Sequence, residues 1–232
     1  MFLAGIGSFF LLLKTYIMKS EKIIIHTYPG RLWYVKNFLV PSLLDQGAKH
    51  ILIANDKHKL GNLLSFVLSL ENLKGDYWHL QDDIIICSDF IERIKNYDGL
   101  VCGICCRGFD NNINSIGLVS IYSMWYSFPC IRIPEEIATA FYNFYMKENK
   151  PDKFDSIINS GKMDDLLFME FLKHYYPKLN VTNLAPNLCD HVDFLLGGSI
   201  ANQQRPGTAR AAYFNEPELV TSLMYKLQVF NH

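Results

Sequence analysis

The sequence lacks an excess of charge of either sign. Its 232 residues include 22 Lys and Arg against 23 Asp and Glu, which gives a formal net charge of -1. Nucleic acid is attracted by a strong positive field, so this balance argues against nucleic acid as a partner. Recognition of a charged ligand must therefore depend on a local cluster of side chains.

The cysteines lack the paired spacing of a zinc module. Among the six, Cys102 and Cys105 have the two-residue spacing of a ligand pair, but no second pair follows at a finger-like distance. Buried free thiols explain the six better, because an unpaired Cys packs as a small hydrophobic residue. Free thiols are typical of a reducing compartment, and we therefore expect a cytoplasmic protein.

The chain also lacks a good membrane-spanning segment at its start. The first 18 residues are apolar, but Lys14 interrupts them and they fall short of the ~20 residues that a spanning helix needs. No small-residue cleavage site follows, which argues against secretion. We interpret residues 1–17 as an apolar extension ahead of a natural start at Met18, and residues 18–232 as a single domain. Weak peripheral association of residues 1–17 with the inner face of the membrane is an alternative interpretation.

What the sequence does have is a regular alternation of two patterns. Half of its residues are hydrophobic, which is enough for a sizeable core. Short β-branched runs alternate with segments whose apolar residues have helical spacing. The expected strands are 22–26, 50–56, 77–80, 100–106 and 178–184, and the expected helices are 33–46, 62–70, 88–96, 134–145, 164–175 and a last one from Glu216. This order predicts an α/β fold with a mostly parallel central sheet flanked by helices, a Rossmann-like three-layer sandwich.

Acidic side chains and one imidazole follow the expected strands. Asp56 ends the second strand, Asp82 and Asp83 follow the third, and Asp190 with His191 follows the last. Ligands of open α/β sheets bind at the carboxyl ends of the strands. Carboxylate and imidazole groups there suit a divalent cation, which neutralises a diphosphate leaving group. An Asp pair before an apolar run is also a common helix N-cap, and this pattern alone leaves both interpretations open.

The block WHLQDDIIICSDF resembles the acidic motif of GT-A glycosyltransferases, in which Glu-Asp-Asp ends a strand and an Asp-Phe pair follows shortly after. The resemblance implies that Asp83 binds the metal that holds the nucleotide diphosphate and that Asp82 lies near the ribose or the sugar. Gln81 stands where Glu is common in the family, so the first acid is missing here. The implied cofactor is Mn²⁺ or Mg²⁺, with a nucleoside diphosphate sugar as the donor.

Two later blocks are similar to the same family and follow in the family's order. NLAPNLCDHVDFLLGGS is similar to the late segment whose His completes the metal site, a position held by His191. GKMDDLLFMEFL is similar to the acidic helix start that supplies a catalytic base or an acceptor contact in inverting members, which corresponds to Asp164 and Asp165.

Several further residues are candidates for binding the donor. The loop after the first strand contacts the nucleotide base in GT-A folds, so the resemblance implicates Tyr28 and Arg31 of HTYPGR. The tail NQQRPGTARAAYF offers Arg205 and Arg210, whose guanidinium groups suit phosphates. Arg132 sits among apolar neighbours and needs a partner if it is buried, which makes it a candidate for donor or acceptor binding.

Together the similar blocks span roughly Lys22 to Phe214. They imply a GT-A-like, inverting enzyme that moves a sugar from a nucleoside diphosphate sugar to a hydroxyl of a glycan, a lipid-linked acceptor or a protein. Two alternatives stay open. A nucleotidyltransferase shares the sheet and the acidic metal site, but usually begins with a Gly-rich loop and a Lys that HTYPGR lacks. A non-catalytic module that binds carbohydrate or a partner would keep the fold without the activity.

Overall fold

The computed structural model describes residues 21–55, 62–71, 73–103, 117–123, 129–147, 151–160, 164–184, 186–197 and 214–230. Its strands are β1 (Lys22–Thr27), β2 (His50–Asn55), β3 (Tyr77–Gln81), β4 (Ile84–Ile86), β5 (Val101–Cys102), β6 (Gly117–Ser120), β7 (Cys130–Ile133), β8 (Asn180–Asn183) and β9 (Cys189–His191). Its α-helices are α1 (Leu32–Tyr34), α2 (Val40–Asp45), α3 (Asn62–Ser69), α4 (Phe90–Ile94), α5 (Glu135–Met146), α6 (Asp155–Ser160), α7 (Asp164–Tyr175) and α9 (Pro217–Phe230).

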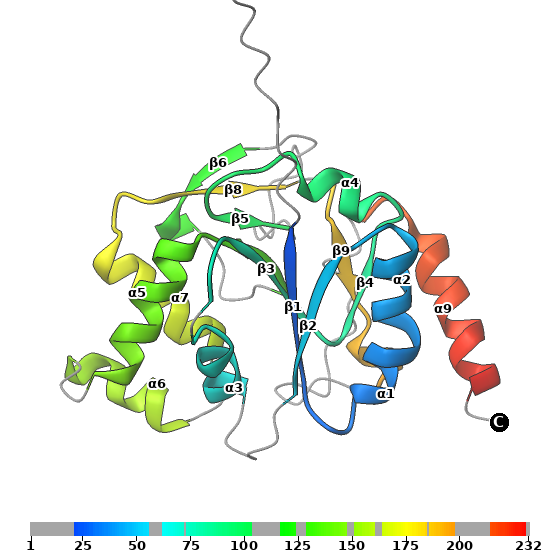
Figure 1. Ribbon diagram of the computed structural model, residues 1–232, viewed down its shortest axis with the longest axis horizontal. Coiled ribbons are helices and arrows are strands. Elements are labelled where there is room, and N and C mark those ends of the chain that lie inside the picture. The colour runs from blue at the N-terminus through cyan, green and yellow to red at the C-terminus, as the bar shows by residue number, and fades with distance from the viewer. Residues whose placement is uncertain are drawn as a thin grey trace, which may run out of the picture.

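A seven-stranded sheet in the order β2-β1-β3-β7-β5-β8-β6 forms the centre of the fold (Figure 1). Strand β1 runs parallel to β2 and β3, and β5 runs parallel to β8. Strand β7 is antiparallel to β3 and β5, and β6 is antiparallel to β8. All the strands except β7 and β6 therefore point the same way, and the predicted mostly parallel α/β sheet is confirmed.

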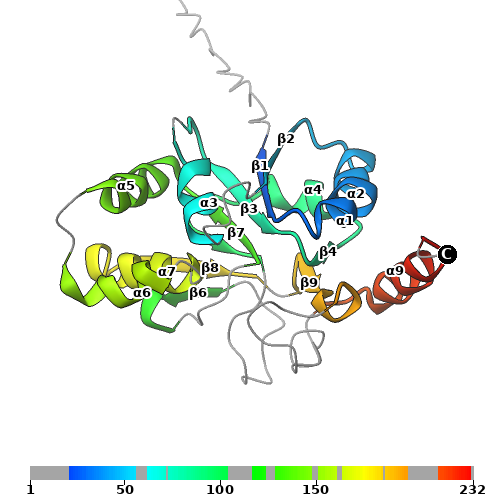
Figure 2. The same ribbon diagram turned by 90° about the horizontal axis from the view of Figure 1, so that it is seen from below.

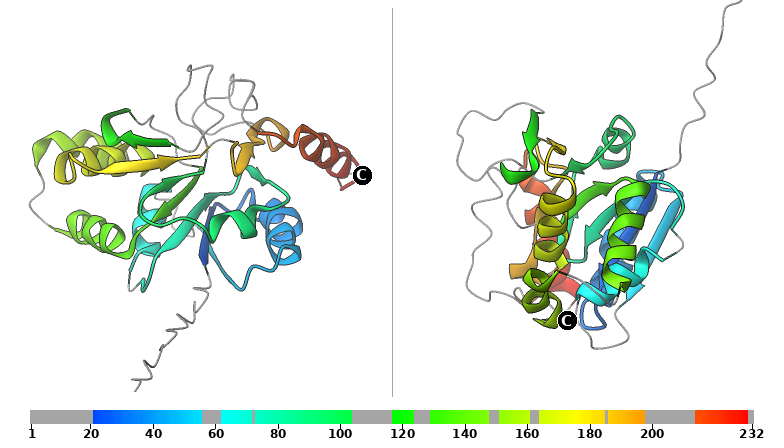
Figure 3. Two further views of the ribbon diagram at one scale, coloured as in Figure 1. Left: turned by 90° about the horizontal axis from the view of Figure 1, so that it is seen from above. Right: turned by 90° about the vertical axis from the view of Figure 1, so that its left-hand side faces the viewer.

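Helices cover both faces of this sheet, as the views from several sides show (Figures 1, 2 and 3). Side chains alternate along β1, so that Ile24 joins one buried core while Ile23 and Ile25 join another. The core around Ile24 packs against α3, α5 and α7, and its middle is aromatic, with Phe141 5.0 Å from Phe168 between ring centroids. The other core packs against α1, α2, α4 and α9. The predicted three layers are thus confirmed.

The first crossover helix is continuous from Leu32 to Asp45 but changes its winding in the middle. Residues Val35–Leu39 form a π-helical segment, η1, between α1 and α2. The helix follows a turn closed by the Arg31 N–H, which donates to the Tyr28 carbonyl at 3.0 Å. It ends before Gly47, whose φ of 86° is in the left-handed region that favours glycine. The predicted helix over 33–46 is therefore confirmed.

Several short elements were not predicted. Strands β4 and β9 pair antiparallel in a ribbon apart from the main sheet, and β6, β7 and α6 also lie where no element was expected. Strands of three or four residues are too short to show a period in the sequence. Within the expected strand over 100–106, the structure has β5 at Val101–Cys102, and residues 104–106 lie outside the described part of the chain.

Two further observations concern the helices as possible membrane spans and the state of the cysteines. Over the described residues, none of the helices combines the length and the apolar character that crossing a bilayer requires. Cys87, Cys102, Cys130 and Cys189 are buried free thiols, as expected. Cys105 and Cys106 lie outside the described residues.

Candidate metal centre

The ends of two parallel neighbouring strands bring the first candidate residues together. Strands β1 and β3 are adjacent, with His26 of β1 opposite Gln81 of β3. The loop that carries Arg31 and the turn that carries Asp82 and Asp83 therefore leave the sheet at the same edge. This is the edge at which open α/β sheets bind ligands.

Arg31 bridges the two acids of this turn. Its Nη1 atom donates to Asp83 Oδ2 at 2.7 Å and to Asp82 Oδ1 at 3.1 Å. The Arg31 side chain is only 4% exposed, and its guanidinium carbon lies 5.4 Å from the centroid of the Tyr28 ring. Burial alone would lower the pKa of Arg31, but the charges of Asp83 and Asp82 and their hydrogen bonds raise it. Arg31 is therefore charged and held by both carboxylates.

The β4–β9 ribbon places His191 beside Asp83. In this ribbon His191 is opposite Ile84, and the Val192 N–H donates to the Asp83 carbonyl at 2.8 Å. His191 Nδ1 consequently lies 3.6 Å from Asp83 Oδ1. The ribbon thus joins a carboxylate and an imidazole from distant parts of the chain.

Asp193 completes a three-residue cluster that the sequence did not reveal. Ligand atoms of Asp83, His191 and Asp193 all lie within 4.8 Å of one another. Asp193 comes two residues after His191 at the end of a strand. Side chains two residues apart in a strand point to the same face, and this spacing could have indicated Asp193 as a further ligand. Its carboxylate also accepts the Phe194 N–H at 2.9 Å.

The cluster fits a divalent metal ion. Asp83 Oδ1 is buried and has no hydrogen-bond partner in the described stretches of the chain, while Arg31 occupies the other oxygen of the same carboxylate. A buried carboxylate oxygen normally accepts a hydrogen bond or binds a cation. Two carboxylates and one imidazole are donors that suit a divalent cation.

Asp82 and Tyr34 flank this cluster. Burial and the charge of Asp83 raise the pKa of Asp82 to about 6, against the opposing effects of Arg31 and a hydrogen bond from Thr27. The buried Tyr34 hydroxyl donates to the Ile84 carbonyl at 2.8 Å, which ties the first crossover helix to the start of β4. Burial and the charges of Asp83 and Asp82 raise the pKa of Tyr34, so this hydroxyl stays neutral.

Asp164, at the start of α7, lies within electrostatic range of the cluster. Burial raises its pKa to about 7, and the negative charges of Asp165 and Asp83 act in the same direction. Backbone N–H groups of Asp164 and Asp165 donate hydrogen bonds to this carboxylate, which lowers its pKa. Asp165 is less buried, and its carboxylate accepts the Leu166 N–H at 2.8 Å. Of the two acids predicted for catalysis, Asp164 is thus the buried one, with a raised pKa.

Arg132 does not belong to this cluster. Its guanidinium donates to Asp76 Oδ2 at 2.6 Å and to the Gly99 carbonyl at 2.8 Å. Asp76 precedes β3, whereas Asp82 follows it, so Arg132 lies toward the opposite end of that strand. The expected need for a partner is met within the fold by Asp76 and Gly99, and a role of Arg132 in donor or acceptor binding stays a prediction.

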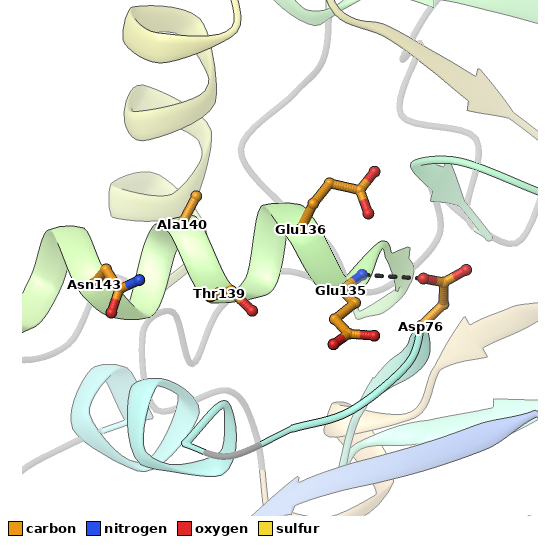
Figure 4. A pocket seen from close by; sticks show the side chains of 6 residues that line it. All are labelled: Asp76, Glu135, Glu136, Thr139, Ala140 and Asn143. Atoms are coloured by element: carbon orange, nitrogen blue, oxygen red, sulfur yellow. Dashed lines mark hydrogen bonds between the residues drawn. The ribbon is translucent and has the colours of Figure 1, made fainter.

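A hollow of about 520 Å³ lies at the same opposite end, along α5 (Figure 4). Two of its acids have backbone partners: Asp76 accepts the Glu135 N–H, and a Glu135 carboxylate oxygen accepts the Gly75 N–H. These bonds order the start of α5, and this acidic hollow is distinct from the cluster of Asp83, His191 and Asp193. Asp56, Arg205 and Arg210 lie outside the described residues, and their predicted roles stay predictions.

The fold and this site define an α/β protein with a carboxylate and imidazole cluster at the carboxyl edge of its sheet. Comparison with protein-family models gives no match, and comparison with curated proteins gives none. Among solved structures, the nucleoside-diphosphate-sugar pyrophosphorylase from Vibrio cholerae RC9 is similar, with a TM-score of 0.44 and 14% identity over 75% of this chain and 78% of that chain. At this level of similarity the neighbour does not identify the activity of this chain.

Proposed function

We propose that this chain is a GT-A-like glycosyltransferase, which moves a sugar from a nucleoside diphosphate sugar to an acceptor hydroxyl. The observation that carries the proposal is the meeting of Asp83, His191 and Asp193 at the carboxyl end of β3. The order of the acidic and His motifs along the sequence supports it. Residues 18–232 form the proposed catalytic domain, with Mn²⁺ or Mg²⁺ as cofactor and a glycan, a lipid-linked molecule or a protein as acceptor.

A divalent cation bound here would act as a Lewis acid toward the negative charge that develops on the departing diphosphate. Asp164 accepts the proton of the acceptor hydroxyl, whose oxygen bonds to the anomeric carbon as the diphosphate leaves. A carboxylate with a pKa of about 7 suits a general base near neutral pH. Asp165 is the alternative base.

The donor is bound by residues around the cluster. Tyr28 stacks on the nucleotide base, and Asp82 faces the ribose or the sugar. Asp56, Arg205 and Arg210 complete the proposed contacts, the two arginines by gripping phosphates. The loop after β1 has a single glycine, Gly30, and no lysine, unlike the triphosphate-binding loop of nucleotidyltransferases.

The test combines thermal unfolding with turnover. Mn²⁺ and a panel of nucleoside diphosphate sugars should raise the melting temperature of the wild-type protein, because a ligand that binds the native state stabilises it by about 2.7 kcal/mol at 100 times its Kd. Asp83→Ala and His191→Ala should lose this rise and the metal-dependent hydrolysis or transfer of the sugar. Asp45→Ala and His50→Ala, at exposed positions of α2 and β2, are the matched controls.

Two other results would replace the proposal. Pyrophosphate release from a nucleoside triphosphate and a sugar phosphate, without turnover of nucleotide sugars, would identify a nucleotidyltransferase. Calorimetric binding of a nucleotide sugar with Mn²⁺ but without turnover would identify a non-catalytic binding module. Unchanged turnover in Asp83→Ala or in His191→Ala would remove that residue from the site.

A further inference from the structure

The candidate metal centre contains a positive charge of its own. Arg31 Nη1 is 2.7 Å from Asp83 Oδ2, while Asp83 Oδ1 faces His191. A metal ion bound to Oδ1 and the guanidinium bound to Oδ2 would share one carboxylate. The Arg31 side chain is 4% exposed and the Asp83 side chain 11% exposed. Water would therefore screen the repulsion between the guanidinium and the metal ion poorly.

The guanidinium therefore weakens the attraction between the site and a free cation. It offsets one of the negative charges of Asp82 and Asp83, and it repels a second cation at the same carboxylate. An anionic diphosphate reverses both effects. It adds negative charge to the site, and its oxygen atoms can accept hydrogen bonds from the N–H groups of the Arg31 guanidinium.

We propose that Arg31 is an internal counter-cation that keeps the affinity for the free metal ion low, so that the ion binds tightly only together with a diphosphate. This inference rests on the proposed function, since it takes Asp83 as a metal ligand. Arg31 acts as a positioning and specificity-determining residue here, by selecting the metal–diphosphate pair over the metal alone.

A purely structural role for Arg31 predicts the opposite sign. If the guanidinium only held the Asp83 carboxylate in place, its removal would loosen the ligand and weaken metal binding. The affinity for Mn²⁺ alone, measured by water-proton relaxation on the intact chain, therefore separates the two roles without any measurement of activity.

Arg31→Gln removes the charge and keeps a hydrogen-bond donor. We expect it to bind Mn²⁺ roughly tenfold more tightly than the wild type, and to gain less from added inorganic pyrophosphate, because a unit charge close to a poorly screened site changes affinity by at least this much. Arg31→Lys keeps the charge, so its affinity for Mn²⁺ should stay near that of the wild type. Asp82→Asn removes one negative charge from the two carboxylates that Arg31 bonds to, so it should weaken Mn²⁺ binding. Equal or weaker Mn²⁺ binding by folded Arg31→Gln would overturn the inference.

Removing Arg31 leaves two buried carboxylates without their shared partner, which is destabilising. The double variant with Arg31→Gln and Asp82→Asn restores the net charge and should fold with a Mn²⁺ affinity near that of the wild type; an affinity far from it would count against the inference. If the wild type binds no Mn²⁺ even with pyrophosphate, the metal centre and this inference fall together. If Mn²⁺ binding requires Asp83 but Arg31→Gln does not tighten it, this inference alone fails.

Discussion

The buried carboxyl of Asp164 makes the stability of the protein depend on pH in an unusual direction. An exposed or salt-bridged Asp has a pKa near or below 3.8, whereas burial raises that of Asp164 to about 7. The folded protein therefore keeps this proton between about pH 4 and pH 7, while the unfolded chain releases it. Because the folded state binds more protons in this window, Asp164 makes the protein less stable as the pH rises through it.

The size of the effect follows from the shift. A change from 3.8 to about 7 corresponds to on the order of 4 kcal/mol, at 1.36 kcal/mol per pKa unit, which is an upper bound. Asp164→Asn removes the ionisable group and should be more stable than the wild type at pH 8 by up to this amount. The gain should shrink toward zero as the pH falls to 4, where Asp164 is protonated in the folded state and about half protonated in the unfolded chain.

The assay is urea unfolding of the metal-free protein, with a chelator present, at pH values from 4 to 8. The informative quantity is the difference in unfolding free energy between Asp164→Asn and the wild type, since the other titrating groups cancel in it. Asp165→Asn is the matched control and should keep most of the pH dependence, because Asp164 remains. A difference that stays constant from pH 4 to pH 8 would refute the reasoning. If Asp164 is also the general base, the stabilised Asp164→Asn variant should lose transfer activity.

Three substitutions test the packing that supports the site. A methyl group added at Gly103 would lie 2.5 Å from the buried Cys130 sulfur, so Gly103→Ala should cost about 1–3 kcal/mol in urea unfolding. Phe141→Ala removes a fully buried ring from the aromatic core and should cost about 3–5 kcal/mol in the same assay. Arg132→Leu should lower the melting temperature in a calorimetric scan by the equivalent of about 2 kcal/mol, less than the loss of a fully buried ion pair because its acidic partner is partly exposed.

Each of these has its own control. Gly117 has no atom within 4 Å of the position of an added methyl group, and equal costs for Gly103→Ala and Gly117→Ala would show that the contact at Gly103 relaxes freely. Phe141→Leu should lose clearly less than Phe141→Ala, and equal losses would deny a role for the volume of the side chain. An unchanged melting temperature for Arg132→Leu would mean that its hydrogen bonds add nothing to stability.

Elements with local signals could be predicted from the sequence. The helix from Asp164 to Tyr175 has the predicted bounds, because two acids mark its first turn and its apolar residues have helical spacing. Strands β4 and β9 carry no such signal. Each has three residues and is defined by its pairing with the other, which depends on contacts between distant segments.

The same division applies to the candidate site. The strand-end rule placed Asp83 at the correct edge of the sheet, but only the register of the β4–β9 ribbon brings His191 to it. Arg31 was expected to contact a nucleotide, and nothing near it in the sequence indicates that it bonds to Asp82 and Asp83. The functional roles assigned to these residues stay predictions.

The β4–β9 ribbon links the candidate metal centre to the completion of folding. Its two strands are separated by about a hundred residues of chain, so joining them requires a long loop to close at an entropic cost. A polypeptide that ends before β9 would carry Asp83 but neither His191 nor Asp193. A metal ion that needs all three of these ligands could thus bind only after the early and late segments of the chain have packed against each other. Its binding would therefore depend on complete folding of the chain.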